Sequence, residues 1–237
     1  MFIMKIFNHI KKFINFAALI VFLLNLPCGK ASGEDIGGNF SQNGNLLNLN
    51  SIVIDKAAKE IRLKVRLAIS DGILEYFLVD ERGKAYESVF KIIGNKPSEL
   101  NFALILLGFV PLEYDVFMKL LNQKDALIKL KKDYSRSLLD ISAAKGNKNI
   151  PLGEIISDRE GKDGELLWVY TGGFLINNNS YAGDASLSYI GIWPDDTTSI
   201  NLFSSNKNPY RGNFGFEMKK GLKVGDEYEL IIRGKRL

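Results

Sequence analysis

The chain has 237 residues, and its 31 basic and 27 acidic side chains give a formal charge of +4. The first 31 residues contain four of the basic residues, no acidic residue, and the only histidine and cysteine, His9 and Cys28. The rest of the chain therefore balances 27 basic against 27 acidic residues and has neither an imidazole nor a thiol. For that part, the composition excludes His or Cys metal sites, Ser-His-Asp or Cys-His catalysis and iron–sulfur clusters.

The first 31 residues have the pattern of a secretory signal peptide. Basic residues precede a mostly apolar run at residues 13–24, and small residues follow it. This run is shorter than the about 20 residues that span a bilayer. We therefore expect export to the periplasm or the extracellular space, with cleavage near Ala31. Lipidation of Cys28, giving a membrane-anchored lipoprotein, is the alternative, although residues 25–27 do not match a lipoprotein box.

The composition changes after the leader. Residues 32–45 are rich in Gly and Asn, which predicts a flexible linker. Residues 46–237 are enough for a single domain of medium size. The patterns described next predict an α+β domain that is mainly antiparallel β-sheet.

The first part of this domain has strand patterns. Apolar and charged residues alternate over residues 60–69, which predicts a strand with one solvated face. After a turn, residues 73–80 read as a second strand, and residues 81–84 as a hairpin loop that leads into a third strand at 85–93. The short connections predict a three-stranded antiparallel meander.

Helical patterns occupy the middle of the chain. Apolar residues on nearly every face predict a buried helix at 98–107, with Ser98 as its cap and Gly108 at its end. An amphipathic spacing predicts a helical excursion at about 113–140. Strand patterns return after residue 150 and finish with a closing strand at 228–232.

Two groups of sequence blocks carry a family resemblance. The first contains residues 72–79, the motif Gly83-Lys84-x-Tyr86-Glu87-Ser88 and residues 96–108. The second contains residues 168–174, the motif Tyr181-Ala182-Gly183-Asp184 and residues 225–232. Together they resemble the YdjY-domain family of exported bacterial proteins, which has no assigned biochemical activity. The resemblance implies one YdjY-like domain that includes the helical segment 111–150, of which residues from about 113 to 148 fit the family pattern poorly.

A polar cluster within the first group is one candidate binding site. It contains Glu75, Lys84, Tyr86 and Glu87. These residues suit a recognition site. Two carboxylates also allow acid–base catalysis. The simplest alternative is a set of surface ion pairs without a function. In a simple hairpin Glu75 and Glu87 are not directly opposite each other, although a bulge would bring them closer.

An aromatic stretch is the second candidate. Its binding residues are Trp168, Tyr170, Tyr181, Asp184 and Trp193, with Asn residues at 177–179 between them. Aromatic faces separated by amides suit sugar or peptide binding. The same alternation is also typical of the core of a β domain.

The sequence does not predict a metal site, a cofactor or a nucleic-acid partner. Asp184, Asp195 and Asp196 offer oxygen ligands for Ca²⁺, but without the spacing of an EF-hand. Residues 111–150 carry a small excess of basic side chains, which we interpret as a solvated helix face, with contact to an anionic membrane surface or a partner as the alternative. A nucleic-acid partner is not expected, because the exported domain is neutral overall. Contact with a membrane is expected only through the leader or a lipid on Cys28.

These patterns favour an exported, non-catalytic binding or interaction module of the cell envelope, with an envelope protein or a small ligand as its partner. Two alternatives stay open. One is a hydrolase-like enzyme that uses carboxylate, Tyr or Lys chemistry, and the other is a structural envelope protein. An enzyme requires a perturbed carboxylate in a pocket, whereas a binding module requires exposed aromatic side chains.

Overall fold

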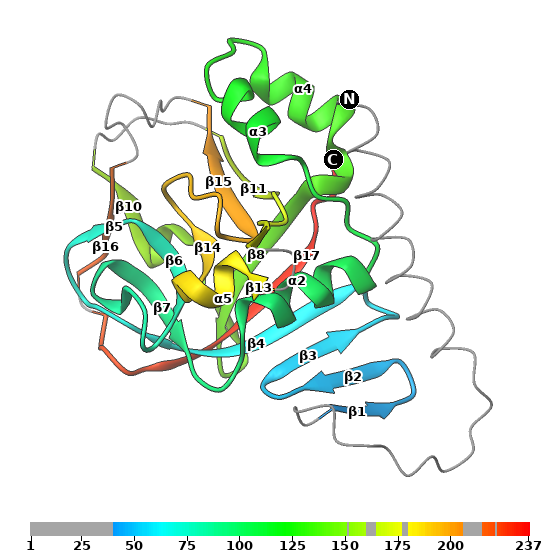
Figure 1. Ribbon diagram of the computed structural model, residues 1–237. Helices are drawn as coiled ribbons and strands as arrows, with labels where there is room; N and C mark the ends of the chain where they lie inside the picture. The colour runs from blue at the N-terminus through cyan, green and yellow to red at the C-terminus, as the bar shows by residue number, and fades with distance from the viewer. Residues whose placement is uncertain (1–39, 151, 160–164, 177–179, 206–214, 221) are drawn as a thin grey trace. The chain divides into compact units, whose positions relative to one another are not determined.

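The computed structural model describes residues 40–150, 152–159, 165–176, 180–205, 215–220 and 222–237 (Figure 1). Residues 39–237 form one compact unit. The predicted signal peptide, including His9 and Cys28, and the predicted linker as far as residue 39 lie outside the described residues. In the described residues no helix has the length and apolar character needed to cross a membrane.

The fold is α+β with strands dominant, as the sequence predicts. Of the described residues, 42% are in strands and 22% are in helices. The sequence did not predict that eight strands close into a barrel (Figure 1). Around the barrel these strands are β4 (Glu60–Leu67), β17 (Glu227–Gly234), β8 (Leu138–Lys145), β11 (Leu166–Tyr170), β15 (Ile200–Ser204), β14 (Ser188–Gly191), β6 (Tyr76–Asp80) and β7 (Ser88–Ile92). The barrel closes because β4 pairs with β7 as well as with β17.

The predicted meander is wrong in its connectivity. Strands β6 and β7 are parallel neighbours, with Tyr76 opposite Ser88, so residues 81–84 are not a hairpin loop. Residues 81–87, which include the 3₁₀ helix η1 (Ala85–Glu87), carry the chain back to the start of β6. This arrangement leaves the other edge of β7 free to pair with β4 and close the barrel.

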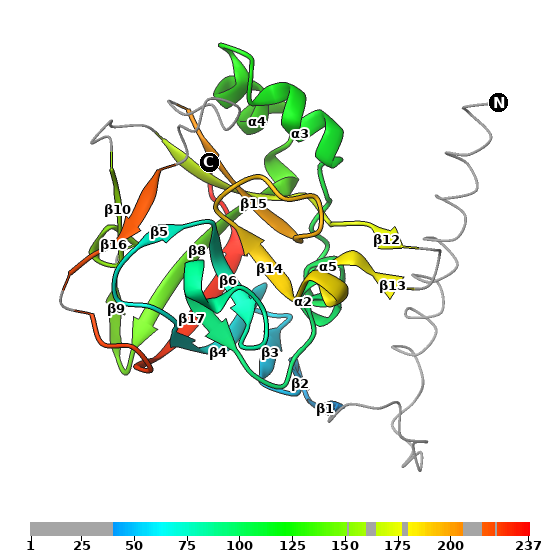
Figure 2. The same cartoon turned by 60° about the vertical axis from the view of Figure 1, so that its left-hand side comes forward.

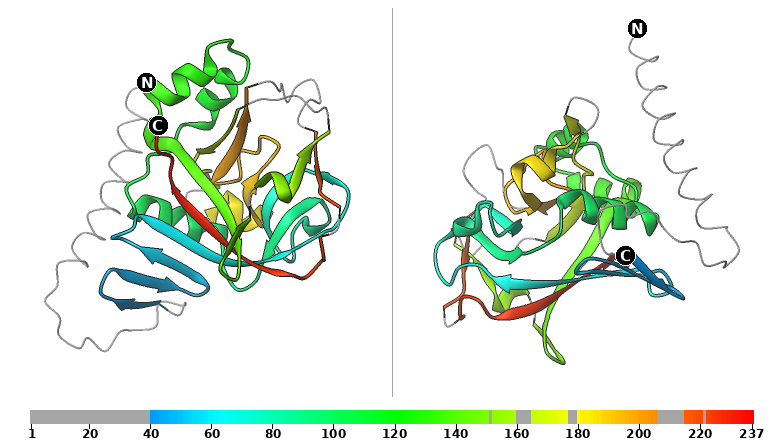
Figure 3. Two further views of the ribbon diagram at one scale, coloured as in Figure 1. Left: turned by 180° about the vertical axis from the view of Figure 1, so that it is seen from behind. Right: turned by 60° about the horizontal axis from the view of Figure 1, so that its bottom comes forward.

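An antiparallel extension continues the sheet from β4 (Figure 3). It contains β1 (Phe40–Asn43), β2 (Leu46–Leu49) and β3 (Ile52–Asp55). The linker predicted at residues 32–45 therefore overlaps the sheet, which begins at Phe40 rather than Leu46. Gly44, with a φ of 59°, forms the turn that makes β1 and β2 a hairpin.

Short strands complete the described sheets. Strand β9 (Lys148–Ile150) pairs with the end of β8. A three-stranded sheet contains β10 (Ile156–Asp158), β16 (Phe216–Met218) and β5 (Ile73–Leu74), and a two-stranded sheet contains β12 (Leu175–Ile176) and β13 (Ser180–Tyr181) (Figure 2). The 3₁₀ helix η3 (Leu152–Glu154) precedes β10.

The buried helix predicted at 98–107 is present as α2 (Pro97–Leu106). Gly108 ends it in the left-handed conformation, and the Phe109 N–H and the Gly108 N–H bond the carbonyls of Leu104 and Ile105, which is a Schellman motif. Ser98 does not cap the helix. The Glu99 carboxylate accepts the Lys96 N–H instead, while Ser98 bonds the short helix α5 (Ala182–Ser186).

The helical excursion predicted at 113–140 is divided and ends early. It contains α3 (Tyr114–Leu120), α4 (Ala126–Asp133) and the 3₁₀ helix η2 (Ser135–Ser137), after which β8 begins at Leu138. The prediction missed β8, which pairs with both β17 and β11. Phe117 and Leu130 of the helices pack with Val169 on β11, so α3 and α4 cover the outside of the barrel there.

Aromatic side chains cross the main core. Trp168 of β11 contacts Phe77 of β6, with ring centroids 4.9 Å apart, and Phe77 contacts Phe90 of β7 at 5.4 Å. Phe90 then contacts Tyr228 of β17 at 5.3 Å. Because these rings come from four different strands, their packing links opposite parts of the barrel. Helix α2 packs on the same core through Leu104.

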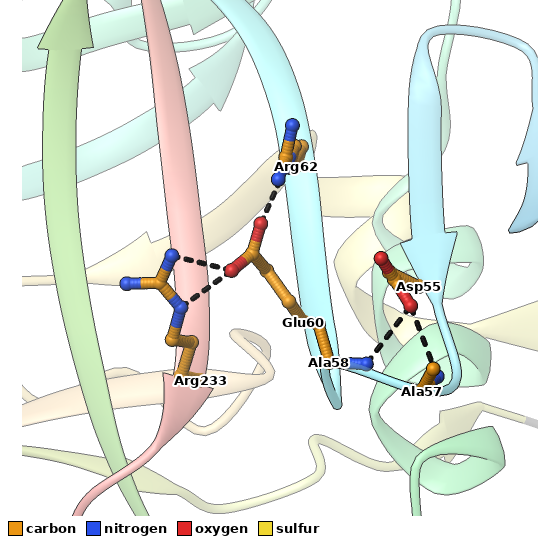
Figure 4. Close-up of polar contacts among 6 residues, drawn as sticks. All are labelled: Asp55, Ala57, Ala58, Glu60, Arg62 and Arg233. Atoms are coloured by element: carbon orange, nitrogen blue, oxygen red, sulfur yellow. Dashed lines mark hydrogen bonds and ion pairs between the residues drawn. The ribbon is translucent and has the colours of Figure 1, made fainter.

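A buried carboxylate joins β4 to β17 on the outside of the barrel. Glu60 accepts hydrogen bonds from Arg62 on its own strand and from Arg233 on β17 (Figure 4). The Glu60 side chain is 3% exposed, whereas both guanidinium groups are half exposed. At the preceding turn, Asp55 accepts the N–H groups of Ala57 and Ala58, both at 2.9 Å. These contacts hold the β3–β4 turn and the end of β17 together.

Candidate functional site

Three segments meet around Lys84 and form a polar site at the surface. They are the junction of β5 and β6, the 3₁₀ helix η1 and the loop after β14. The Glu75 N–H bonds the Glu87 carbonyl at 3.0 Å, and the Glu75 carbonyl accepts the N–H groups of Ile192 and Trp193, both at 2.9 Å. The backbone of Glu75 is therefore held between the other two segments.

Lys84 contacts both carboxylates predicted for this site. Its Nζ lies 3.4 Å from Glu75 Oε2 and 3.2 Å from Glu87 Oε1. It also lies 5.2 Å from the centre of the Tyr76 ring, within the range of a cation–π contact. Parallel pairing of β6 and β7, rather than a bulge in a hairpin, brings Glu75 and Glu87 together.

Tyr76 connects this site to Asp195 in the loop after β14. The Tyr76 hydroxyl donates to Asp195 Oδ2 at 2.8 Å, while Thr197 donates to Oδ1 through its N–H and its hydroxyl at 2.8 and 2.7 Å. The buried Asn201 of β15 bonds the Asp195 N–H and carbonyl. Asp195 is therefore fixed by the barrel wall. We call Glu75, Tyr76, Lys84, Glu87 and Asp195 the Lys84 cluster.

Both proton donors of the Lys84 cluster are held in their protonated forms. Burial, followed by the nearby charge of Asp195, raises the pKa of Tyr76 to about 12. For Lys84, partial burial acts to lower the pKa, but contact with Glu87 and the nearby charges of Glu87 and Glu75 outweigh it and raise the pKa above its usual range. Lys84 is therefore an ammonium ion at neutral pH, and Tyr76 is a neutral phenol.

The Lys84 cluster has three carboxylates and one ammonium group, so its formal charge is negative. Glu75 and Lys84 are 34% and 46% exposed, which leaves them accessible from solvent. An ammonium ion held by two carboxylates is a poor nucleophile or base, because both roles require its neutral form. The arrangement suits the binding of hydrogen-bond donors or cations better than proton transfer.

Two predicted aromatic residues lie next to the Lys84 cluster. Tyr86 is in η1 between Lys84 and Glu87, and its side chain is 72% exposed. Trp193 follows β14 and is partly buried, with its N–H bonded to Glu75. The structure thus brings Trp193 from the aromatic candidate to the polar candidate, although they are more than 100 residues apart in the sequence.

Two other predicted aromatic residues belong to the core. Trp168 is 5% exposed and packs on Phe77, and Tyr170 is fully buried with its hydroxyl donated to Asn101 of α2 at 2.7 Å. They do not form the exposed aromatic surface considered from the sequence. The alternative interpretation, alternating aromatics in a β core, describes them correctly.

Tyr181 and Asp184 hold elements together beside the core. The Tyr181 hydroxyl donates to the Gly172 carbonyl at 3.1 Å and lies 2.7 Å from Ser199 Oγ. Asp184 accepts the Ser98 N–H and hydroxyl at 2.8 and 2.7 Å, so it anchors α5 to the start of α2. Gly173 is required here, because a Cβ atom would lie 2.5 Å from the Tyr181 hydroxyl.

Sequence analysis did not include Tyr76 or Asp195 in the polar candidate. Tyr76 lies in an apolar strand, where the pattern predicts a core residue. The sequence indicates Asp195 only as a weak Ca²⁺ ligand. In the structure Asp195 binds Tyr76, whereas Asp184 binds Ser98. Among the described residues no group of three or more His, Cys, Asp or Glu side chains is placed to hold a metal ion. The Asn residues at 177–179 lie outside the described residues.

Comparison of the chain with protein-family models, with curated protein sequences and with solved structures gave no match. The interpretation of the Lys84 cluster therefore depends on its own geometry and on the sequence patterns.

Proposed function

We propose that residues 40–237 form a non-catalytic binding module that acts in the cell envelope after export. The Lys84 cluster and the neighbouring Tyr86 form its recognition surface. One observation carries this proposal: Lys84 Nζ lies 3.4 Å from Glu75 Oε2 and 3.2 Å from Glu87 Oε1, while the Glu75 side chain is still 34% exposed. A hydrolase-like enzyme would instead use a carboxylate as the base with Tyr76 or Lys84 as a general acid, which requires these groups to face one bound substrate.

The proposed surface combines charge with an exposed ring. Glu75 offers carboxylate oxygens to solvent, and Tyr86 offers an aromatic face with a hydroxyl. Both groups suit a partner that presents cationic or hydrogen-bond donor groups, because carboxylates and aromatic faces each attract cations. Tyrosine is also enriched among residues that dominate binding energy.

The proposed relation to YdjY-domain proteins has support from the way the resembling blocks pack. Asp184 of the second group bonds Ser98 of the first, and Tyr170 bonds Asn101. Glu75 and Glu87, from separate blocks of the first group, are joined through backbone and Lys84. The residues that carry the resemblance therefore meet in space, as parts of one domain signature would.

Affinity capture from the native envelope tests the recognition surface. Wild-type protein, Tyr86→Ala and Glu75→Gln serve as baits, with Ile128→Ala on α4, which removes a side chain of similar exposure, as the control. We expect both site variants to lose a partner that the wild type and Ile128→Ala retain. Equal capture by all four proteins contradicts the proposed surface and favours a structural envelope protein.

Intact mass of the protein recovered from the envelope tests export. Cleavage near Ala31 gives an unmodified chain without the leader. A mass that includes Cys28 with acyl chains supports the lipoprotein alternative, and retention of the whole leader contradicts cleavage.

A further inference from the structure

A separate groove lies on the outside of the barrel, across β8, β17, β4 and β7. Its volume is about 460 Å³, which is within the range of small-ligand sites. Ala144, near the end of β8, and Ile93, just after β7, mark its two sides. None of the residues of the Lys84 cluster lines this groove. We call it the β4–β17 groove.

The strand register separates opposite charges within the groove. One cross-strand row places Glu229 of β17 beside Lys64 of β4. The next row places Glu227 of β17 beside Arg66 of β4 and then Lys91 of β7. The β17 side therefore carries carboxylates, and the side formed by β4 and β7 carries cations.

Some of this charge is already neutralised within the groove, and some is not. Arg66 donates two hydrogen bonds to Glu227 Oε1, at 3.0 and 3.2 Å. In the part of the chain that the structure describes, no ion pair within 4.0 Å involves Lys64, Lys91 or Glu229. Lys64, Lys91 and Glu229 therefore keep their charged groups clear of direct ion pairs there, although Glu229 lies opposite Lys64 in the register and its charge also acts on Arg62.

We propose that the β4–β17 groove binds a small zwitterion, with its carboxylate toward Lys64 and Lys91 and its ammonium group toward Glu229. Short peptides and free amino acids are the chemical class that has both groups on a compact frame. A purely anionic ligand would meet Glu229 and Glu227, and a purely cationic one would meet the lysines. Only a ligand with both charges complements both sides of the groove.

The sheet forks at one side of the groove. Strand β4 pairs with β3 as far as Leu63 and with β7 from Arg66, so Lys64 lies where the two partners diverge. Ser51 of the β2–β3 turn lines the groove at this point. Since β3 and β7 leave β4 in different directions there, the outer face is not a continuous flat sheet.

Nuclear magnetic resonance titration with the dipeptide Ala-Ala tests the proposal on the wild-type protein. We expect the amide signals of β4, β7 and β17 to shift, and those of α4 to stay in place. N-acetylated and C-amidated Ala-Ala, each lacking one charge, should bind up to about fivefold more weakly, the most that one exposed charge contact supplies. No shift in these strands with Ala-Ala, or equal binding of all three peptides, overturns the proposal.

Two variants assign the two charges to their sides of the groove. Lys64→Gln should weaken binding of Ala-Ala and of the N-acetylated peptide, but not of the C-amidated one. Glu229→Gln should weaken binding of Ala-Ala and of the C-amidated peptide, but not of the N-acetylated one. Lys132→Ala, which removes an exposed lysine of α4, is the control. If the sensitivities do not follow this pattern, the orientation of the ligand and the proposal fail.

Discussion

Tyr76 has two roles at the scale of single residues. Its ring lies within the barrel wall, 8% exposed, while its hydroxyl donates to Asp195 and its face contacts Lys84. This combination explains why an apparently apolar strand contains a residue of the candidate site. It also makes the protonation of Tyr76 part of the stability of the fold.

Stability should therefore depend on Tyr76 at alkaline pH. The pKa of Tyr76 is raised from 10.0 to about 12 in the folded state, so the folded protein keeps a proton that the unfolded chain loses. Its contribution is fully present below pH 10 and is lost as the pH rises to about 12. The loss should be about 2–3 kcal/mol.

Urea unfolding of the wild type and Tyr76→Phe at neutral and alkaline pH measures this contribution. Burial also raises the pKa of Tyr170, Tyr181 and Tyr189, so both proteins should lose stability in alkali. The wild type should lose more. Parallel pH profiles for the two proteins contradict the assignment to Tyr76.

Glu60 should contribute much more to stability than an exposed carboxylate in the same strand pair. Glu60→Ala leaves Arg62 and Arg233 without their shared partner and should lower the free energy of unfolding by about 2–3 kcal/mol. This is below the range for a fully buried pair because the guanidinium groups are half exposed. Chemical denaturation measures the difference. Glu227→Ala, which removes a 74% exposed partner of Arg66, should cost less than about 1 kcal/mol.

A variant of Glu87 distinguishes a structural role of the Lys84 cluster from a role in recognition. Its side chain is 19% exposed, and its Oε1 atom is buried against Lys84. Glu87→Ala should therefore cost more than an exposed carboxylate but less than a fully buried pair, about 1–3 kcal/mol. Chemical denaturation measures the loss of stability, and capture from the envelope measures the loss of partner binding. A large loss of stability with partner capture intact would make Glu87 structural.

At the scale of elements, α2 is the helix that the core depends on. Leu104 is fully buried, and α2 connects to the rest of the domain through Asn101 and Ser98 as well as through apolar packing. Helices α3 and α4 instead cover a second apolar cluster on the outer face of β11 and β15. If α3 and α4 detached from this second cluster, the main core around α2 would stay packed.

Truncation of Leu104 tests the role of α2. Leu104→Ala should lower the free energy of unfolding by about 2–5 kcal/mol, because it leaves a cavity in the main core. Ile128→Ala on α4, where the side chain is 67% exposed, should change it by less than about 0.5 kcal/mol. Thermal or urea unfolding gives both values. Similar values for the two variants would show that α2 is not a core helix.

At the scale of the whole molecule, closure of the barrel determines which strands are best protected. Strand β17 is paired on both sides, with β4 and β8, and its inward side chains are buried. Among the strands that the structure describes, β1 pairs with β2 alone, and all four of its residues are exposed. The two strands lie at opposite extremes of burial and pairing.

Hydrogen exchange should follow this order. Amides of β17 should exchange slowest, close to the rate set by global unfolding, and those of β1 fastest among the strands. Mass spectrometry of exchanged peptides measures both. Rapid exchange in β17 would be incompatible with a closed barrel, whereas slow exchange in β1 would indicate that another chain segment covers its free edge.

Local patterns in the sequence determined several elements by themselves. The alternation around Leu63 and Val65 encodes β4, because a strand with one buried face requires a period of two. The apolar run that ends at Gly108 encodes α2, because only a residue that tolerates positive φ terminates it in this way. The lack of His and Cys after residue 31 excluded whole classes of site from that part of the chain, whatever its fold.

Tertiary structure decided the pairing of strands and therefore the site. The short connection between β6 and β7 favours a hairpin locally. In the folded protein the two strands are instead parallel neighbours in a closed barrel, where Phe77 and Phe90 pack with rings from β11 and β17. Only this pairing places Glu75 beside Glu87, with Lys84 between them. Such long-range packing has no periodic signal in the sequence, because Phe90 and Tyr228, for example, are 138 residues apart.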